Sequence, residues 1–340
     1  MQQQGISAVI ICRDEQRTIA AAIDSLLGLV DEILVLDTGS TDSTLDILSG
    51  YGAAITLHTC RWNDDFSAAR NFAIAQTRYR WCLMLDADEY IAGESRPEFR
   101  QTLTRLMHED RGLTLYAPLI DNLNGTQLLN NARLFKKRPS LRYYGRVHEY
   151  LREAQSEIRF VPEIRIHHTG YLTDSEHQKH KHQRNWTLLQ QQMALEPNNL
   201  RWQYFALRYL PDDGPKYADI MRNFAALPLP YDSQWEIYAL NIKARFIHWL
   251  LLRGEPHQAF QHAEVLYQHY QSREVTTLYL LARYLNAREN FREEAWIAYQ
   301  LQLSLNDLES DDYLTERADI GSFRHALAEF TQIANGNLLR

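Results

Sequence analysis

Apolar and polar positions follow two different spacing patterns in the first part of the chain. Short runs rich in β-branched residues, such as residues 6–12 (ISAVIIC), alternate with segments like residues 15–30, where Ile19 and Ile23 follow helical spacing. The first pattern predicts buried strands and the second predicts helices that pack through one face. The predicted strands are residues 6–12, 31–37, 53–60 and 81–89, and the predicted helices are residues 15–30, 39–52 and 66–78.

This alternation predicts an α/β domain built on a mostly parallel sheet. Strands that alternate with helices of this length are joined by crossover connections. Ligands of such sheets bind beyond the carboxyl ends of the strands. Asp37 and Asp86 stand at the ends of two predicted strands. We therefore expect both side chains to face one crevice.

The pattern changes twice further along the chain. In residues 113–169 apolar segments are separated by polar loops, and we expect antiparallel strands that complete the first domain. From residue 175 the spacing is helical, with little strand character. The sequence therefore predicts two domains, residues 1–174 and an all-α domain over residues 175–340.

The predicted helical domain contains weakly repeated segments. Residues 249–267 and 279–300 share an apolar, Gly or Asn, Ala and aromatic layout, and residues 195–210 form a more degenerate unit. The spacing is typical of tetratricopeptide (TPR) helical hairpins, although the full consensus is missing. We therefore expect a TPR-like domain that recognises an acceptor or forms a homodimer.

Composition and charge exclude several classes of protein. The chain has 340 residues with a formal net charge of −7, which argues against a nucleic-acid binder or a protein that binds anionic membranes. The three cysteines lack CxxC spacing, which favours a reducing compartment. No apolar run is long enough to span a bilayer, and the N-terminus has no basic leader. We expect a cytoplasmic protein.

The loops after the predicted strands narrow the choice of enzyme class. The loop after the first strand, CRDEQRT, has no glycine, and the sequence contains no GxGxxG, GxxxxGK[ST], HExxH or GxSxG motif. These absences exclude nicotinamide dehydrogenases, P-loop ATPases, zinc proteases of the HExxH type and α/β-hydrolases.

An acidic cluster lies at the end of the fourth predicted strand. Asp86 and Asp88 are two positions apart, so both carboxylates can reach one cation where the strand gives way to a loop. Such oxygen ligands suit Mg²⁺ or Mn²⁺, above all when phosphate oxygens complete the shell. The alternative is a solvated acidic pair. Asp42, in the turn that opens a predicted helix, is equally explained as a helix cap or as a ligand contact.

Several motifs in order resemble the family 2 inverting glycosyltransferases, whose GT-A fold binds a nucleotide-sugar. They are residues 8–27, 31–44 (DEILVLDTGSTDST), 62–73 (WNDDFSAARNFA) and 81–89 (WCLMLDADE). The resemblance continues through residues 133–151, 166–171 and 181–199, a longer pattern similar to the sublancin peptide S-glycosyltransferase branch of the family.

The resemblance implies roles for residues around the donor. Asp37 would contact the nucleobase or ribose, Asp42 would lie in the donor site, and Arg70 and Asn71 would lie beside the donor. Arg70 also makes sense as a counter-charge to the carboxylates or to diphosphate. Asp86 and Asp88 would form the DxD site for the diphosphate and a metal, Mn²⁺ or Mg²⁺, with His168 as third ligand and His167 as the alternative.

Inverting transfer needs a base that takes the acceptor's proton. Glu149 in GRVHEYL is the candidate, with His148 as an orienting neighbour and Asp121 as the next choice. The alternative is that Glu149 only forms an ion pair with Arg146 or Arg152 on the surface. Charge on the leaving diphosphate would be offset by the metal and by Arg70, Arg133 and Arg146.

The expected activity is metal-dependent transfer of a sugar from a nucleotide-sugar, a UDP-hexose, to a Cys, Ser or Thr side chain of a peptide or protein. The same branch leaves lipopolysaccharide core or another cell-surface glycan open as the acceptor. An alternative of another class is a non-catalytic scaffold, in which the helical repeats bind partners.

Overall fold

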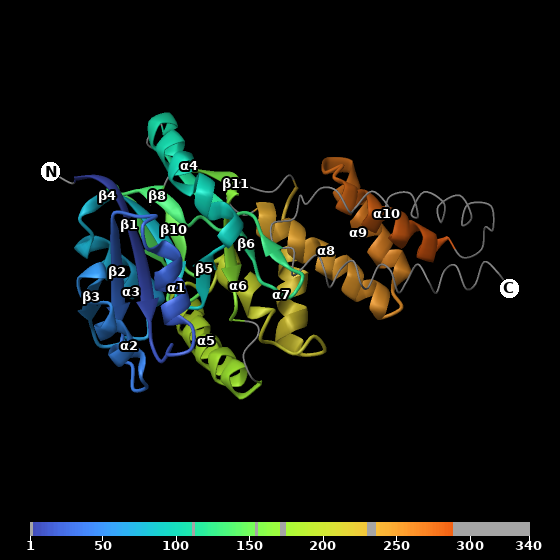
Figure 1. The fold of residues 1–340 in the computed structure, drawn as a ribbon. Helices are drawn as coiled ribbons and strands as arrows, with labels where there is room; N and C mark the ends of the chain where they lie inside the picture. Colours follow the sequence, from blue (N-terminus) through green and yellow to red (C-terminus); the bar gives the residue numbers. More distant parts are fainter. Residues whose placement is uncertain (1–2, 111–112, 154–155, 171–174, 230–235, 288–340) are drawn as a thin grey trace. The chain divides into compact units, whose positions relative to one another are not determined.

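A computed structural model describes residues 3–110, 113–153, 156–170, 175–229 and 236–287 (Figure 1). Its first part is built on a sheet whose strands follow the order β3-β2-β1-β4-β8-β6-β11-β5, with β7 paired to β6. The four strands that come first in the chain pair in parallel, as the alternating pattern predicts. They are β1 (Gln3–Cys12), β2 (Glu32–Asp37), β3 (Thr56–Thr59) and β4 (Tyr79–Asp86), connected by α1 (Ile19–Leu26), α2 (Thr44–Gly50), the short η1 turn (Gly52–Ala54) and α3 (Phe66–Gln76).

The other half of the sheet is mixed. Strand β8 runs antiparallel to both β4 and β6, and β5 runs antiparallel to β11. A separate two-stranded sheet pairs β9 with β10. The bounds are β5 (Glu89–Ile91), β6 (Thr114–Asp121), β7 (Gln127–Leu128), β8 (Leu134–Lys136), β9 (Arg142–Tyr144), β10 (Tyr150–Arg152) and β11 (Glu157–His168).

One pairing differs from the sequence prediction. The antiparallel arrangement expected for residues 113–169 is wrong for β6 and β11, which pair in parallel from Glu157↔Thr114 to His167↔Asp121. Parallel neighbours need a crossover of a dozen or more residues. The chain between Asp121 and Glu157 supplies it and carries β7 to β10. The parallel pairing brings the carboxyl end of β11 to the same edge of the sheet as that of β6.

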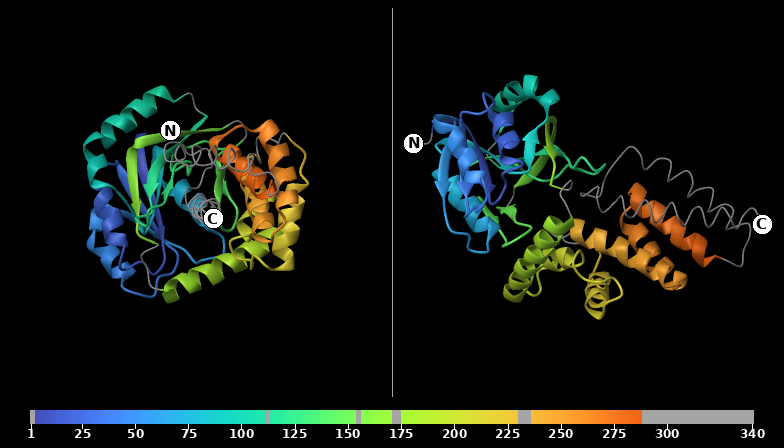
Figure 2. Two further views of the ribbon diagram at one scale, coloured as in Figure 1. Left: turned by 90° about the vertical axis from the view of Figure 1, so that its right-hand side faces the viewer. Right: turned by 60° about the horizontal axis from the view of Figure 1, so that its bottom comes forward.

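Helices cover both faces of this sheet (Figure 2). On one face, residues of α1, α2 and α4 (Arg96–Glu109) pack with inward side chains of the strands, among them Ile23, Leu48 and Phe99. On the other face, Ala69 and Ala73 of α3 pack against the sheet together with residues of the β9 segment. Burial on both faces explains why β1 and β2 read as continuous apolar runs.

Helix α4 was not predicted, although the sequence carries its signals. It follows a short turn, η2 (Gly93–Ser95), and has Pro97 in its first turn, where a missing N–H costs nothing. Its buried positions Phe99, Thr102, Leu103 and Leu106 follow helical spacing.

The strand register sets the positions of the candidate residues. In the parallel half, Cys12 pairs with Asp37 across β1 and β2, and Ile11 pairs with Asp86 across β1 and β4. On the mixed side, His168 pairs with Glu89 across β11 and β5. The acidic end of β4 and the histidine end of β11 therefore lie at one edge of the sheet.

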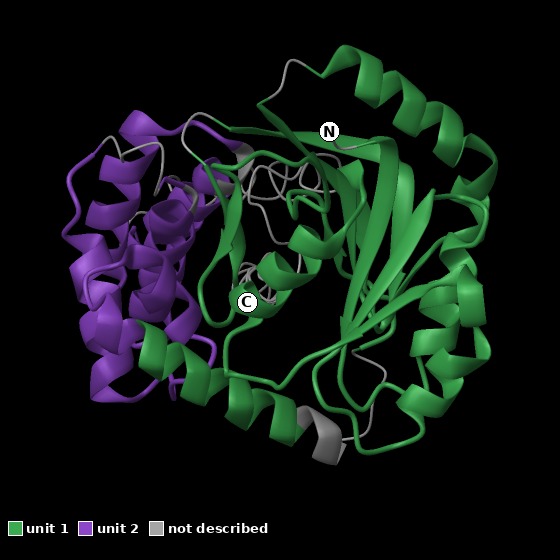
Figure 3. Cartoon of the chain, turned by 90° about the vertical axis from the view of Figure 1, so that its left-hand side faces the viewer, with its two compact units in different colours: residues 1–192 green, residues 193–340 purple. Residues whose placement is uncertain are grey.

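By internal contacts the chain divides into two compact units, residues 1–192 and residues 193–340 (Figure 3). The division falls inside α5 (Ser175–Leu195), later in the chain than the boundary predicted from the sequence. The described part of the second unit is helical, as expected. Its helices are α6 (Leu200–Ala206), α7 (Pro215–Ala225), α8 (Glu236–Leu252), α9 (Pro256–His269) and α10 (Arg273–Asn286).

The first predicted TPR-like segment, residues 249–267, spans the end of α8, the turn that follows and most of α9. Gly254 has φ of +74°, its N–H donates to Leu251 O, and the N–H of Glu255 donates to Leu250 O. This is a Schellman ending, which favours glycine, and Pro256 then starts α9. The second segment continues past residue 287 and lies partly outside the described residues. No helix among those that the structure describes is long and apolar enough to cross a membrane.

Candidate active site

Asp86 lies between two buried arginines. Its Oδ1 accepts a hydrogen bond from Nη2 of Arg70 and its Oδ2 accepts one from Nη2 of Arg133, each at 2.7 Å. Both arginine side chains are 7% exposed. Burial disfavours the charged form of Asp86, but Arg133 and Arg70 more than offset it, so the pKa of this carboxyl lies well below its usual range.

The ion pairs continue on both sides of Asp86. Nε of Arg70 donates to Oε1 of Glu149 at 2.6 Å, and Nη2 of Arg133 also donates to Oε1 of Glu89 at 2.7 Å. Glu89 in turn accepts from the backbone N–H of Asp86 at 2.9 Å. The result is a row of alternating charges, Glu149–Arg70–Asp86–Arg133–Glu89, which we call the charge row. It ties the ends of β4 and β5 to α3 and to the segments before β8 and β10.

The charge row keeps unused hydrogen-bond donors. Nη1 of Arg70 and Nε of Arg133 are buried and have no hydrogen-bond partner among the described residues. Buried polar groups are normally paired, and an orphaned donor calls for a reason. A guanidinium with a spare donor is suited to an anionic oxygen of carboxylate or phosphate type.

A second centre forms around Asp88. Its Oδ2 lies 3.4 Å from Nε2 of His168 and 3.1 Å from Nζ of Lys181 on α5. The N–H and Oγ1 of Thr169 both donate to the backbone oxygen of Asp88 at 2.9 Å. A Cβ added to Gly170 would lie 2.2 Å from Oδ2 of Asp88 and 2.5 Å from Nε2 of His168. Only glycine fits there, because any side chain would fill the space on which the two polar atoms converge.

Asn122 orients His168. Its Oδ1 lies 2.8 Å from Nδ1 of His168, and because this oxygen can only accept, the Nδ1 of the ring is the donor. Asn122 is 1% exposed and is itself held by Thr126. In the neutral ring this arrangement leaves the lone pair of Nε2 facing Asp88. His167 points elsewhere, with Nδ1 3.4 Å from the hydroxyl of Tyr90.

The three residues expected to share one metal ion are therefore divided. Asp88 and His168 converge, whereas both oxygens of Asp86 accept from arginines. Across the described residues, no group of three or more His, Cys, Asp or Glu side chains is arranged to hold a metal. A carboxylate oxygen beside an imidazole nitrogen nevertheless fits Mn²⁺ or Mg²⁺, provided that ligand oxygens and water complete the shell.

Asp37 and Asp42 serve local structure. Asp37 is 1% exposed, and its Oδ1 accepts from the N–H groups of Gly39 and Ser40 at 2.9 and 3.0 Å. Oδ1 of Asp42 accepts from the N–H of Thr44 at 2.9 Å, a turn contact just before α2, whose N-cap residue is Ser43. Neither carboxylate lines the pocket described next.

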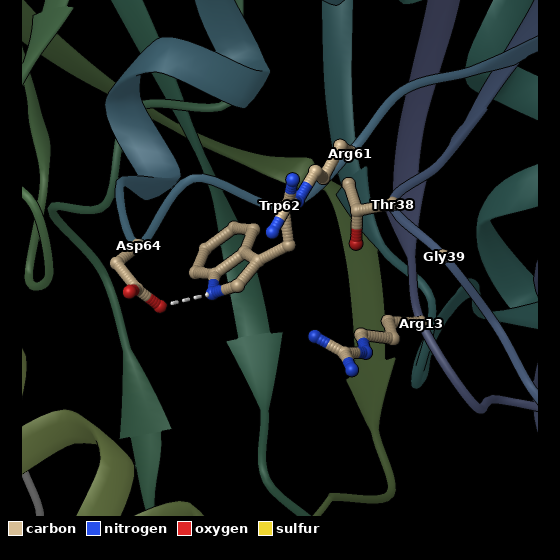
Figure 4. A pocket seen from close by; sticks show the side chains of 6 residues that line it. All are labelled: Arg13, Thr38, Gly39, Arg61, Trp62 and Asp64. Carbon is tan, nitrogen blue, oxygen red and sulfur yellow. Dashed lines mark hydrogen bonds between the residues drawn. The ribbon is translucent and has the colours of Figure 1, made fainter.

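An open pocket of about 490 Å³ lies beside the ends of β2 and β3, lined by Arg13, Thr38, Gly39, Arg61, Trp62 and Asp64. Figure 4 shows the Trp62 ring and the guanidinium of Arg13 at this pocket. Nε1 of Trp62 donates to Oδ1 of Asp64 at 2.7 Å, and its ring meets that of Phe66 edge to face. These contacts fix the indole at the wall of the pocket.

Two other predicted donor residues hold neighbouring segments together. The side-chain amide of Asn71 donates to the backbone oxygen of Tyr143 at 2.8 Å and accepts from its N–H at 2.9 Å, which joins α3 to β9. Nη1 of Arg146 donates to the backbone oxygen of Asp64 at 3.1 Å. Arg146 thus lies next to the pocket, apart from the charge row.

The candidate bases occupy different settings. Glu149, with an 11% exposed side chain, pairs with Arg70 and not with Arg146 or Arg152. His148 before it has φ of +52°, an uncommon left-handed conformation for a histidine. Asp121 is the last residue of β6, and its Oδ1 accepts a hydrogen bond from the N–H of Leu123 in the turn that follows.

Three residues at this edge of the sheet were not predicted from the sequence as site residues: Asn122, Lys181 and Glu15. Asn122 had a signal, because it is a polar residue directly after a buried strand. Burial and then the charge of Asp88 raise the pKa of Glu15. Lys181 had no signal, since it belongs to a histidine-rich stretch that reads as an exposed helix start.

Parts of the chain are similar in sequence to known proteins. Residues 7–151 match the family described as Glycosyl transferase family 2. The SPbeta prophage-derived glycosyltransferase SunS of Bacillus subtilis is 28% identical over 207 residues, 60% of this chain and 49% of the relative. A TPR repeat-containing protein of Synechococcus elongatus is 34% identical over 205 residues, 57% of this chain and 49% of the relative. The chain thus spans about half the length of these relatives.

Among solved structures, a crystal structure of S. aureus TarS 1-349 covers 92% of this chain and 93% of that chain, at 13% identity and a TM-score of 0.38. The family match, residues 7–151, contains the whole charge row as well as Asp88. It also spans the parallel strands and the β4–β8–β6 part of the sheet. Residues 7–151 are therefore similar to the family 2 glycosyltransferase domain, and this part of the chain is built on the mixed sheet described above.

Proposed function

We propose that this chain is an inverting glycosyltransferase that moves a sugar from a nucleotide-sugar, a UDP-hexose, to an acceptor. The observation that carries the proposal is the pairing of two centres at one edge of the sheet. One is the charge row with the spare donor of Arg70, and the other is the Asp88–His168 pair above Gly170. Together they offer positive and metal-binding groups to a diphosphate at the place where sheets of this kind bind ligands.

The pocket beside β2 and β3 suits the nucleoside. The Trp62 ring offers a face for stacking, and stacking of a base on an aromatic ring is sequence-tolerant. Arg13 and Arg61 supply donors and no acceptors, which favours a base edge rich in carbonyl oxygens. Uracil fits that description, and this supports UDP over other nucleotides.

Asp88 and His168 would hold a divalent ion, which would stabilise the charge of the leaving diphosphate as a Lewis acid. Asn122 keeps the imidazole turned so that Nε2 is the ligand atom. The buried Arg70 donates its free Nη1 to the diphosphate, while Arg133 keeps Asp86 ionised and in place. In this proposal Asp86 positions the arginines and does not bind the ion.

Glu149 would take the proton of the acceptor. Its Oε1 is bonded to Arg70, which fixes the carboxylate and leaves Oε2 to accept. As the acceptor heteroatom attacks the anomeric carbon, its proton passes to Oε2 and the bond from that carbon to the diphosphate oxygen breaks. The left-handed backbone at His148 sets the direction in which Glu149 leaves the chain.

For the acceptor we propose a Cys, Ser or Thr side chain of a peptide or protein. Support comes from the motif resemblance to the peptide S-glycosyltransferase branch and from the likeness to glycosyltransferase SunS over 207 residues. We place the reaction in the cytoplasm, because Cys12, Cys60 and Cys82 are free thiols. Dimerisation through the helical unit stays a prediction.

The test is a binding screen of UDP-, GDP-, CDP- and TDP-sugars, read as a shift of the melting temperature with Mn²⁺, Mg²⁺ or EDTA. The proposal expects stabilisation by a UDP-hexose in the presence of metal and a smaller effect with EDTA. Stabilisation by no nucleotide-sugar under any condition would contradict it and would favour the non-catalytic scaffold.

A further inference from the structure

Lys181 reaches the proposed metal site from a helix outside the sheet. Its Nζ lies 3.1 Å from Oδ2 of Asp88, the same oxygen that faces Nε2 of His168 at 3.4 Å. The side chain of Asp88 is 11% exposed and that of Lys181 is 37% exposed. The ammonium therefore occupies the open side of a carboxylate that is otherwise enclosed.

The surroundings of Lys181 are acidic. Besides Asp88, the charges of Glu15 and Asp86 act on its ammonium group. Asp86 already accepts hydrogen bonds from two arginines, whereas neither arginine of the charge row pairs with Asp88. Lys181 thus supplies Asp88 with the positive charge that the arginines supply to Asp86.

We propose that Lys181 is a built-in counter-ion which a divalent metal must displace from Asp88, so that metal and donor bind cooperatively. This inference rests on the proposed function, because it takes Asp88 and His168 as the metal ligands. It assigns to Lys181 a positioning role that no sequence motif indicated.

The cooperativity follows from competition for one oxygen. Without donor, a metal ion that binds Oδ2 of Asp88 must break the Lys181 ion pair and leave the ammonium close to a divalent cation. A diphosphate offers that ammonium a new anionic partner and offers the metal further oxygen ligands. Each ligand therefore lowers the cost of binding the other, and the coupling is the same in both directions.

The experiment measures Mn²⁺ affinity by electron paramagnetic resonance of free Mn²⁺, with and without UDP. The variants are Lys181→Gln, Lys181→Arg and the control Lys179→Gln, which removes an exposed lysine from the same helix. Loss of a unit charge next to the ligand oxygen is expected to tighten Mn²⁺ binding without UDP roughly tenfold in Lys181→Gln. The factor by which UDP tightens Mn²⁺ binding should fall by about the same amount. Lys181→Arg, which keeps the charge, and Lys179→Gln should behave as the unaltered protein.

The outcomes separate this inference from the proposed function. Asp88→Asn is included to identify the metal site. If Asp88→Asn abolishes Mn²⁺ binding while Lys181→Gln leaves both the affinity and the UDP coupling unchanged, the counter-ion role is wrong and the metal site stands. If Mn²⁺ binds to none of these proteins, with or without UDP, the metal site fails and the counter-ion role fails with it.

Discussion

Nε of Arg70 donates a hydrogen bond to Oε1 of Glu149 at 2.6 Å, although α3 and the segment before β10 are far apart in the sequence. The same guanidinium binds Asp86, and its charge stabilises both carboxylates in a buried setting. The contact joins the carboxylate that we propose as the catalytic base to the buried ion pairs of the domain. Stability and activity should therefore depend on this arginine together.

Replacing Arg70 by Met should destabilise the fold strongly. The substitution leaves Asp86 and Glu149 without this partner, and breaking a buried pair from one side costs about 3–5 kcal/mol. Arg159→Met is the control, because Arg159 pairs with Glu109 at the surface, where such pairs contribute at most about 1 kcal/mol. Urea denaturation measures both. Equal losses in the two variants would show that the charge row does not stabilise the domain.

Trp62 should govern the affinity for the donor more than the rate of transfer. Removing a stacking face costs roughly 1–3 kcal/mol per base, so Trp62→Ala should raise the KM for the nucleotide-sugar about tenfold and leave kcat nearly unchanged. Trp62→Phe keeps an aromatic face and should recover most of the affinity. Initial rates over a range of donor concentrations give both constants. A fall in kcat alone would place Trp62 outside the nucleoside pocket.

Glu149→Gln should affect alcohol and thiol acceptors differently. General-base catalysis contributes roughly 10²–10⁴-fold, so transfer to a serine peptide should slow by a factor in that range. A thiol ionises near pH 8.5 and needs less help, so transfer to the matching cysteine peptide should slow less. Rates with the two peptides, measured by mass spectrometry at pH 8, make the comparison. Equal slowing of both acceptors would argue against Glu149 as the base.

The second unit should lose stability as the pH falls below 6.5. Lys243, 4% exposed, lies with its Nζ 2.9 Å from Nδ1 of His262, and it also donates to the backbone oxygen of Ala225. Burial, followed by the charge of Lys243, lowers the pKa of His262 from 6.5 to about 4. A lowered histidine pKa means that stability is fully present above pH 6.5 and declines as the pH falls toward 4.

The free energy of unfolding should fall by about 2–3 kcal/mol over that pH interval. Lys243 does not contribute to this pH dependence, because it stays protonated in both the folded and the unfolded state. Urea denaturation of the chain at several pH values between 4 and 7 measures it. His262→Asn should flatten the dependence, whereas His257→Gln, at an exposed position of the same helix, should not. A dependence that survives in His262→Asn would rule out this histidine as its source.

The sequence predicted the parts of the fold that local patterns encode. Apolar runs and helical spacing predicted the βα alternation, residue spacing indicated the acidic cluster at the end of the fourth strand, and the motif resemblance indicated Arg70 and the histidine of β11. The direction of β11 relative to β6 was mispredicted, because a strand's apolar content does not tell which way its crossover runs. The approach of Lys181 to Asp88 is a tertiary contact between distant segments, which neither periodicity nor spacing reveals.

The roles within the acidic cluster show the same limit. Spacing suggested that Asp86 and Asp88 share one cation, since two carboxylates two positions apart can do so. In the structure Asp86 instead forms ion pairs with the arginines, whereas Asp88 lies beside His168 and Lys181. Which partner a carboxylate takes depends on side chains that reach it from α3, α5 and the segment before β8.

The most direct test of the account is the rate of nucleotide release from the donor that binds best, with Mn²⁺ or EDTA, for the unaltered protein and for Asp88→Asn. Asp46→Asn, at an exposed position of α2, is the matched control. We expect nucleotide release that needs the metal, is unchanged in Asp46→Asn and falls roughly a hundredfold or more in Asp88→Asn. Release at the same rate in EDTA, or an Asp88→Asn variant as fast as the unaltered protein, would contradict it.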